Sequence, residues 1–334
     1  MKQTNNAIKF LMAQYRAIFK NANIAMVAAI VASALAAGQA NAAPISLGAS
    51  ADKVAPSIDV TAKDATAPAT GGYVNKLTIK NGGILTFDGS ANANQNHIRV
   101  GELLTVESGG KLILKGKVGT NNDGAGLGVV GTFDDSFDDK DSSLKVTGGT
   151  VEITASQLQM NHVDLKDATV TIGTNIQDDY GKGSDFSDNS QISVVANPAG
   201  GGDFTVSGKS TLNLQSGSII TAEELNLNGG SINMSGKAAS GEAAVLRAHG
   251  SSVVNIAGAD IKTTESGNYI GGANINMTSG SITVSGTSVL HLTGKLDKSK
   301  NLADAQAAGN VNVTGGKVTV EKGGTLSIKG DSSF

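Results

Sequence analysis

The stretch LNLNGGSINM, at residues 225–234, places a Gly-Gly pair between two short runs in which apolar and polar residues alternate. The apolar members of this alternation are Leu225, Leu227, Ile232 and Met234. A period of two residues is typical of β-strands that bury one face and expose the other. Glycine adopts the positive φ values that a tight bend requires. The stretch therefore predicts a strand, a bend and a second strand, with the four apolar side chains in a core.

The same pattern recurs along most of the chain. Its clearest copies are LTIKNGGILTF at 77–87, LTVESGGKLIL at 104–114, LKVTGGTVEI at 144–153, INMTSGSITV at 275–284 and VNVTGGKVTV at 311–320. Degenerate copies lie between them, FTVSGKSTLNL at 204–214 and VNIAGADIKT at 254–263. Phe204 and Leu225 are 21 residues apart, as are Val254 and Ile275, and one turn of a parallel β-helix uses about this number. A repeated β unit at this interval predicts a solenoid.

Two other all-β architectures fit parts of the pattern. A propeller blade uses about 40 residues and usually carries aromatic signatures, whereas this chain has no Trp. A Gly-Gly pair also suits the turn of an antiparallel hairpin. Similar stretches at constant spacing favour rungs stacked in register instead. We therefore predict an all-β, right-handed parallel β-helix of roughly a dozen rungs, with the hand taken from the general preference of parallel crossovers.

Residues 1–42 have the features of an extended signal peptide. Lys2, Lys9, Arg16 and Lys20 precede an apolar stretch of 14 residues at 24–37, and no acidic residue occurs among them. Ala40-Asn41-Ala42 then forms a small-x-small cleavage site. Fourteen residues are few for a membrane span. We predict cleavage between Ala42 and Ala43.

The remaining chain divides by composition. Residues 43–70 hold three of the four prolines and many Ala, Thr and Ser residues, which predicts a linker or an N-terminal cap. Residues 71–334 carry the repeats and are predicted to form the β-helix. The chain ends soon after another strand-like stretch, TLSIK at 325–329, so we expect the sequence to be truncated at its C-terminus.

Charge and cysteine content narrow the functional classes. The chain has no Cys, which excludes a disulfide scaffold. Without the four basic residues of the leader, 22 basic and 29 acidic residues remain, and Arg99 and Arg247 are the only arginines among them. A chain with few arginines and a negative net charge is poorly suited to binding phosphates. We therefore expect no nucleic-acid partner.

Longer segments, expected to be surface loops, interrupt the repeat. We expect the sequence variation of the surface to lie in them. They lie at 119–143, 177–189, 236–251 and 295–310, and the last two are rich in Ala, which predicts a helical turn or two in each. The first contains the acidic run Asp134, Asp135, Asp138, Asp139 and Asp141. Its spacing matches neither an EF-hand loop nor a glycine-aspartate nonapeptide repeat. A solvated acidic loop is the favoured interpretation, with a Ca²⁺ site as the alternative.

No other group of residues predicts catalysis. The four histidines, His97, His162, His249 and His291, stand without surrounding motifs, and Gly330-Asp331-Ser332-Ser333 resembles the surroundings of a nucleophilic serine only in part. No pair of carboxylates recurs at rung spacing near Arg99 or Arg247, whereas glycoside chemistry needs carboxylates gathered on one face, commonly with a basic residue. We expect no catalytic, cofactor-binding or metal-binding residues. Polar residues at outward strand positions are predicted to form ladders along the sheet faces; they include Asn213, Asn226, Asn255, Asn276 and Asn312.

The extended leader, the absence of cysteine and the repeated strand–Gly-Gly–strand units together resemble the passenger region of a Gram-negative autotransporter of the pertactin-like β-helix kind. The resemblance covers essentially the whole chain. It implies a stalk displayed at the cell surface or outer membrane, or released outside the cell, often adhesive. Such a stalk is carried across the outer membrane by a C-terminal translocator barrel, which this sequence lacks and which we expect in the full-length protein or in a partner. A partner-secreted haemagglutinin-like protein is the nearest related interpretation.

The predicted function is therefore that of a structural and adhesive surface protein without catalytic activity or a cofactor. Its expected partner is a surface glycan or protein of a host or of bacteria, with self-association as a further possibility. The alternative is a β-helix carbohydrate-active enzyme, either a polysaccharide lyase or a glycoside hydrolase.

Overall fold

A computed structural model describes residues 44–91, 96–117, 128–132, 142–173, 190–194, 202–237, 243–248, 253–293 and 308–333. The chain divides into two compact units, Met1–Ala43 and Pro44–Phe334. The first unit, with the predicted leader, lies outside the described residues. The account below concerns the second unit alone. No helix in the described ranges is long and apolar enough to cross a membrane.

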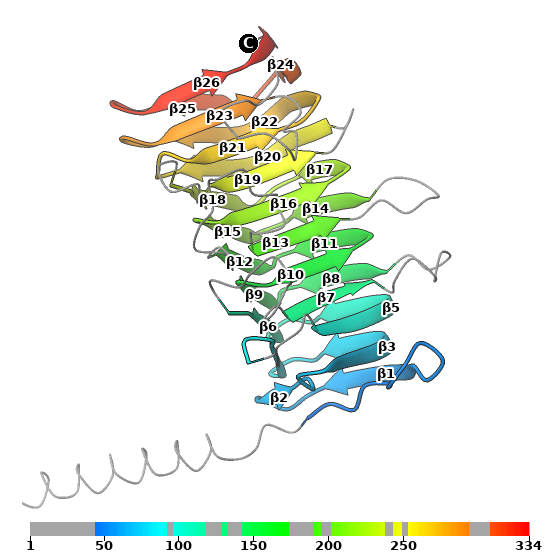
Figure 1. Ribbon diagram of the computed structural model, residues 1–334. Helices are drawn as coiled ribbons and strands as arrows, with labels where there is room; N and C mark the ends of the chain where they lie inside the picture. Colours follow the sequence, from blue (N-terminus) through cyan, green and yellow to red (C-terminus); the bar gives the residue numbers. More distant parts are fainter. Residues whose placement is uncertain are drawn as a thin grey trace, which may run out of the picture. The chain divides into compact units, whose positions relative to one another are not determined.

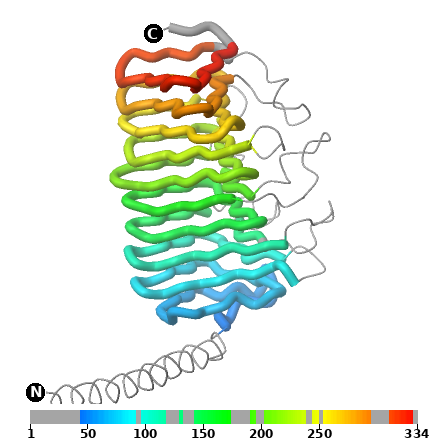
Figure 2. The backbone as a smooth tube through the Cα atoms, turned by 90° about the vertical axis from the view of Figure 1, so that its left-hand side faces the viewer, coloured from blue at the N-terminus to red at the C-terminus, as the bar shows by residue number. Residues whose placement is uncertain are grey.

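The second unit is an all-parallel β-solenoid. Every pairing between its named strands is parallel, and each strand pairs with strands that lie about one turn earlier and one turn later in the sequence. Figures 1 and 2 show the turns stacked in sequence order. Within the described residues nine turns contain three strands each, and part of a turn lies at either end. The fold is thus compatible with the predicted β-helix.

The strands form three stacks, which we call sheets 1, 2 and 3 in the order in which each turn visits them. Sheet 1 contains the first parts of β3 (Gly71–Ile79) and β5 (Asn96–Val106), then β7 (Gly128–Thr132), β10 (Gln157–Met160), β13 (Ser190–Val194), β16 (Ser218–Ala222), β19 (Ala244–Ala248), β21 (Asn268–Gly271), β23 (Val289–Thr293) and β26 (Thr325–Ile328). Sheet 2 contains β1 (Ala55–Val60), the second parts of β3 and β5, β8 (Ser143–Thr147), β11 (His162–Lys166), β14 (Asp203–Ser207), β17 (Glu224–Leu227), the first parts of β20 (Val253–Thr263) and β22 (Asn274–Val284), β24 (Ala308–Val313) and β27 (Gly330–Ser333). Sheet 3 contains β2 (Ala65–Thr66), β4 (Ile84–Asp88), β6 (Lys111–Lys115), β9 (Thr150–Thr154), β12 (Thr169–Gly173), β15 (Thr211–Gln215), β18 (Ser231–Ser235), the second parts of β20 and β22, and β25 (Lys317–Val320).

The core is one continuous column of stacked apolar side chains. In sheet 2, Leu225 pairs with Val254, Val254 with Ile275, and Ile275 with Val311. All four are at most 1 % exposed. The predicted inward positions Leu225, Leu227, Ile232 and Met234 are confirmed, since they too are 0–1 % exposed. Each turn therefore buries its apolar face against its neighbours, and full burial of one such side chain contributes roughly 1.5–3 kcal/mol.

The Gly-Gly pairs form the bend between sheet 2 and sheet 3. In the 225–234 stretch, Gly230 has a φ of 79°. A Cβ built on Gly230 would lie 2.4 Å from the carbonyl oxygen of Ser210 on the preceding turn. Glycine is required here both by the left-handed backbone and by the close approach of the two turns. The flanking strands β17 and β18 pair with strands of neighbouring turns and belong to different sheets, which rules out the hairpin.

The segment 43–70, expected to be a linker or a cap, contains β1 and β2 in its described part, and these strands pair with β3 and β4. Ahead of β1, Ile45 and Leu47 pack against the core. Gly48 and Tyr73 exchange two backbone hydrogen bonds of 2.8 and 3.0 Å, which form an isolated antiparallel bridge. The stretch from Pro44 onward thus belongs to the solenoid and closes one end of its core.

In its middle turns, sheet 1 differs from the other two sheets because both of its faces are buried. Every residue of β16 and β19 is buried. On the outward face, Ile219, Val245 and Tyr269 form a small apolar cluster with Ala243, separate from the main core. The helical turns expected within 236–251 are wrong for the part that the structure describes, because 244–248 is the buried strand β19.

Candidate functional site

The outward face of sheet 2 carries a row of asparagines on successive turns. Asn226 pairs in register with Asn255, Asn255 with Asn276, and Asn276 with Asn312. Nδ2 of Asn255 donates to Oδ1 of Asn226, and Nδ2 of Asn312 donates to Oδ1 of Asn276, both at 3.0 Å. All four side chains are partly exposed. The predicted polar ladder is therefore confirmed for these residues.

A second row runs beside the first, two residues earlier in each strand. Asn310 donates from Nδ2 to Oδ1 of Asn274 at 3.1 Å. Nδ2 of Asn255 also donates to Oε1 of Glu224 at 3.0 Å, which links the two rows. We call the six asparagines of sheet 2 the amide face; they are Asn226, Asn255, Asn274, Asn276, Asn310 and Asn312. It is a flat array of neutral groups that both donate and accept hydrogen bonds.

A shorter ladder lies on sheet 3. Nδ2 of Asn233 donates to Oδ1 of Asn213 at 2.9 Å, and Asn213 donates to Oγ1 of Thr171 at 3.3 Å. Asn213 therefore belongs to a different face from the other four predicted ladder residues, because it follows the bend at Gly208, where the chain passes from sheet 2 to sheet 3.

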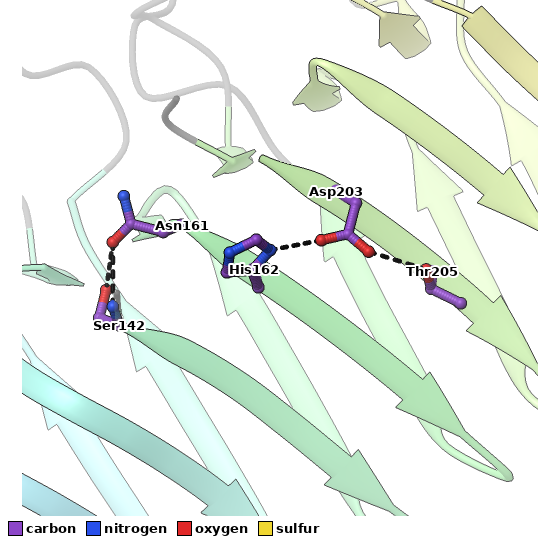
Figure 3. A network of polar contacts seen from close by, with 5 residues as sticks. All are labelled: Ser142, Asn161, His162, Asp203 and Thr205. Atoms are coloured by element: carbon purple, nitrogen blue, oxygen red, sulfur yellow. Dashed lines mark hydrogen bonds and ion pairs between the residues drawn. The ribbon is translucent and has the colours of Figure 1, made fainter. Parts of the chain in front are cut away.

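An imidazole–carboxylate pair lies on the outward face of sheet 2, nearer the N-terminal end than the amide face (Figure 3). His162 begins β11 and Asp203 begins β14 on the next turn. Nδ1 of His162 contacts Oδ1 of Asp203, while Oδ2 of Asp203 accepts a long hydrogen bond of 3.5 Å from Oγ1 of Thr205. The side chains of His162 and Asp203 are 37 % and 45 % exposed. An exposed pair of this kind stabilises the fold by little, but it orients the imidazole.

A buried serine lies near this pair in space but does not join it (Figure 3). Ser142 donates from both its backbone N–H and its Oγ to Oδ1 of Asn161, each at 3.0 Å. Ser142 is fully buried. Its carbonyl oxygen accepts backbone hydrogen bonds from Asn161 and His162 at 2.9 and 3.2 Å. The serine therefore fixes the start of β11, and this geometry gives it no role as a nucleophile.

The other histidines lie on different strands. His97 is on β5 in sheet 1, and His249 is outside the described residues. His291 on β23 stacks on Tyr269 of the preceding turn, with ring centroids 4.6 Å apart and an interplanar angle of 16°. Burial raises the pKa of Tyr269 and lowers that of His291, and the positive charge of Lys329 lowers the pKa of His291 further. The neutral forms of both rings are thus favoured.

The two arginines of the repeat region both lie in sheet 1. The guanidinium of Arg99 lies 6.0 Å from the ring centroid of Tyr73, within range of a cation–π interaction. Arg247 is on β19 and is only 4 % exposed. The two residues are on different strands and one is buried, so they do not form a basic patch.

Charged side chains pair across the turns nearer the N-terminal end. Lys76 lies 3.2 Å from Glu102, and Lys111 lies 2.8 Å from Glu152. Lys80 contacts both Asp59 and Glu107, at 3.7 and 3.4 Å. Most of these side chains are well exposed, so each pair contributes at most about 1 kcal/mol. Along sheet 2 the outward side chains therefore change from charge pairs such as Lys76–Glu102 to neutral amides.

The acidic run and residues 330–333 were the two other candidate segments. The acidic run 134–141 lies outside the described residues. Residues 330–333 form β27, which pairs with β24. In the part of the chain that the structure describes, no three His, Cys, Asp or Glu side chains lie close enough together to hold a metal ion.

Sequence analysis missed three members of the ladders and the imidazole–carboxylate pair. Asn274 and Asn310 stand at outward positions of strands whose other asparagine had been recognised, and Asn233 follows the alternation of the 225–234 stretch, so the period of two could have found all three. The His162–Asp203 pair gave no such signal, because 41 residues separate its members.

Comparison with known proteins does not place the chain in a family. No protein-family model matches it, no curated protein matches its sequence, and no solved structure matches its fold. The function must therefore be argued from the geometry described above.

Proposed function

We propose that this protein is a structural and adhesive protein of the cell surface, whose solenoid presents outward side chains to a ligand. The observation that carries this proposal is the amide face of sheet 2, where Asn226, Asn255, Asn276 and Asn312 repeat on successive turns. Stacked turns share one core and stabilise their neighbours, so the array is rigid. A rigid, repeated row of neutral hydrogen-bonding groups suits an extended ligand better than chemistry on a small substrate.

We extend the proposal to the type of protein. It is the passenger region of an autotransporter, built as a right-handed parallel β-helix. The extended signal peptide at 1–42 supports export, and the strong preference of parallel crossovers supports the right hand. The protein is then displayed on, or released from, the outer membrane of a Gram-negative bacterium. Its translocator barrel belongs to the full-length protein or to a partner.

The partner in this proposal is a glycan or a protein on a host or bacterial surface. Self-association is a second outcome of the same chemistry, because an amide array is complementary to another amide array.

An attachment assay tests the adhesive function. Beads coated with the exported protein are allowed to settle on epithelial monolayers and on lawns of Gram-negative bacteria, and the fraction that resists washing is counted. Beads coated with urea-unfolded protein are the control, since they carry the same composition without the solenoid. We expect the folded protein to increase retention severalfold. Equal retention of both kinds of bead on every surface would end the adhesive proposal.

A carbohydrate-active enzyme is the second candidate, and the His162–Asp203 pair is the observation that favours it. A carboxylate that orients an imidazole is a common arrangement for a general base, and both side chains are accessible from solvent. The test is depolymerisation of uronic-acid polymers, with and without Ca²⁺, by the protein and by a His162→Gln variant. Activity that the variant loses would establish the enzyme in place of the adhesin.

A further inference from the structure

The six asparagines of the amide face carry no charge, and Glu224 is the only charged residue in the two rows that they form across four turns. Besides the asparagines, Glu224 and Val253 are the other residues at its outward positions in the two registered rows. No Lys or Arg occupies an outward position of these rows from β17 to β24. Recognition of carboxylate or phosphate polymers requires such cations. The face is therefore complementary to an uncharged ligand.

The amide face also offers hydrogen-bonding groups that the protein does not use. Oδ1 of Asn274 and of Asn276 each accepts a hydrogen bond from the following turn. Among the described residues no acceptor is assigned to Nδ2 of either side chain, and both are partly exposed. An amide has two N–H donors and a carbonyl with two lone pairs. The face thus presents donors and acceptors side by side, a pattern that hydroxyl groups match because each hydroxyl also does both.

The spacing of the face favours a polymer. Neighbouring strands lie about 4.8 Å apart, so a chain laid along the solenoid axis meets an equivalent amide at every turn. Each hydrogen bond exchanged with water makes only a small net contribution to the binding free energy. A single sugar would therefore bind weakly, whereas several linked sugars would add their contributions on one rigid surface.

We infer that the amide face binds a neutral, hydroxyl-rich polysaccharide that lies across successive turns of sheet 2. The inference rests on the proposed adhesive function and names the ligand class and the residues that hold it. The inference predicts that affinity rises with ligand length, from disaccharide to polymer. Carboxylates on the ligand should not strengthen binding.

Affinity electrophoresis tests the inference. The exported protein is run through native gels that contain dextran, yeast mannan or hydroxyethylcellulose, with alginate as the acidic comparison. We expect at least one neutral polymer to retard the protein and short oligomers of the same sugar to compete poorly. The double variant Asn276→Ala/Asn312→Ala should weaken this retardation about tenfold, because two amides leave the array.

A matched control comes from sheet 3. Asn213 and Asn233 form the same kind of amide pair, with a hydrogen bond of 2.9 Å. The double variant Asn213→Ala/Asn233→Ala removes the same atoms from the other face and should leave retardation unchanged. Urea unfolding of both variants, measured in parallel, identifies any loss that comes from the fold, and single Asn→Gln replacements at 276 and 312 then serve as milder substitutes.

The outcomes separate the inference from the function on which it rests. Retardation that is lost only in the sheet 2 variant supports the inference. Equal effects of both double variants, or retardation by alginate alone, would overturn it. Beads that attach to cells while no neutral polymer retards the protein would also overturn it and leave the adhesive function standing. The sheet 2 variant could instead lose self-association in analytical ultracentrifugation, while added glycan changes neither protein. This result would show that the face is an interface between copies and would refute the inference.

Discussion

Asn312 donates a hydrogen bond of 3.0 Å to Asn276, although 36 residues separate the two in sequence. The same relationship links Asn255 to Asn226 across 29 residues. The intervals differ because the two turns contain different numbers of residues, while the register between strands is kept. Stacking in register therefore matters more to the outward surface than the number of residues in each turn.

Replacement of Leu227 by Asp should strongly destabilise the solenoid. Leu227 is completely buried between neighbouring turns, so a carboxylate there would lose its hydration without gaining a partner. The expected loss is several kcal/mol. The neighbouring Asn228 is exposed, and Asn228→Asp should change the unfolding free energy little. Urea unfolding curves of the two variants measure the difference, and similar midpoints would contradict the alternation of inward and outward residues.

The Gly-Gly bends offer a comparison between two glycines with similar backbones. Gly82 has a φ of 76°, and no atom lies within 4 Å of a Cβ built there. Gly82→Ala should therefore lower the unfolding free energy only by the strain of an alanine in the left-handed region, about 1–2 kcal/mol. Gly230 has a φ of 79° and also a close approach to Ser210. Gly230→Ala should cost about 1–3 kcal/mol more, because the turns must move apart. Equal losses in chemical denaturation would show that the turns are not so closely stacked.

The stacked rings of Tyr269 and His291 predict a dependence of stability on pH. Burial, and then the charge of Lys329, lower the pKa of His291 below its ordinary value of 6.5. The unfolded chain therefore takes up this proton at a higher pH than the folded chain does. The stability that the neutral His291 ring adds to the folded state is fully present above pH 6.5. It is lost as the pH falls toward the lowered pKa.

Comparison with a His291→Phe variant isolates this effect from other titrating groups, because phenylalanine keeps an aromatic ring beside Tyr269 without a titrating proton. Unfolding midpoints measured at about pH 7.5 and about pH 5 should fall further in the parent protein than in the variant. Parallel changes in the two proteins would refute the prediction.

The leader should be removed between Ala42 and Ala43. The second compact unit begins at Pro44, one residue after the predicted new N-terminus, and Ile45 already donates a backbone hydrogen bond of 2.9 Å to Thr66. N-terminal sequencing of the exported protein is expected to begin Ala-Pro-Ile. A mature protein that still contains Lys2 to Lys20 would disprove cleavage.

The sequence predicted the strands of sheets 2 and 3 and missed most strands of sheet 1, although the strand-like stretch at 325–329 contains β26 of sheet 1. Strands such as β17 and β18 bury alternate residues, so their period of two is visible in the sequence. In β16 and β19 every residue is buried, which removes the alternation and leaves a short apolar run that fits a strand or a helix equally well. The prediction of helical turns in 236–251 rested on Ala content and failed because Ala244–Ala248 is one of these fully buried strands.

The candidate site was predictable only in part. Outward asparagines followed from the same alternation that identified the core. Their partners did not, because hydrogen bonds such as Asn255 to Glu224 join residues 31 positions apart. Irregular turn lengths hide such pairs from any argument based on spacing, as they hid His162 and Asp203.

Labelling of single cysteines on intact cells tests the central claim, that the amide face of a folded solenoid is presented at the cell surface. The chain contains no Cys, so each introduced thiol is the only one in this chain. Asn276→Cys places a thiol on the partly exposed face, and Val206→Cys places one at a fully buried position. We predict that a membrane-impermeant maleimide labels Asn276→Cys on intact cells and labels Val206→Cys only after unfolding. Labelling of Asn276→Cys that requires cell lysis, or equal labelling of both variants on intact cells, would contradict the account.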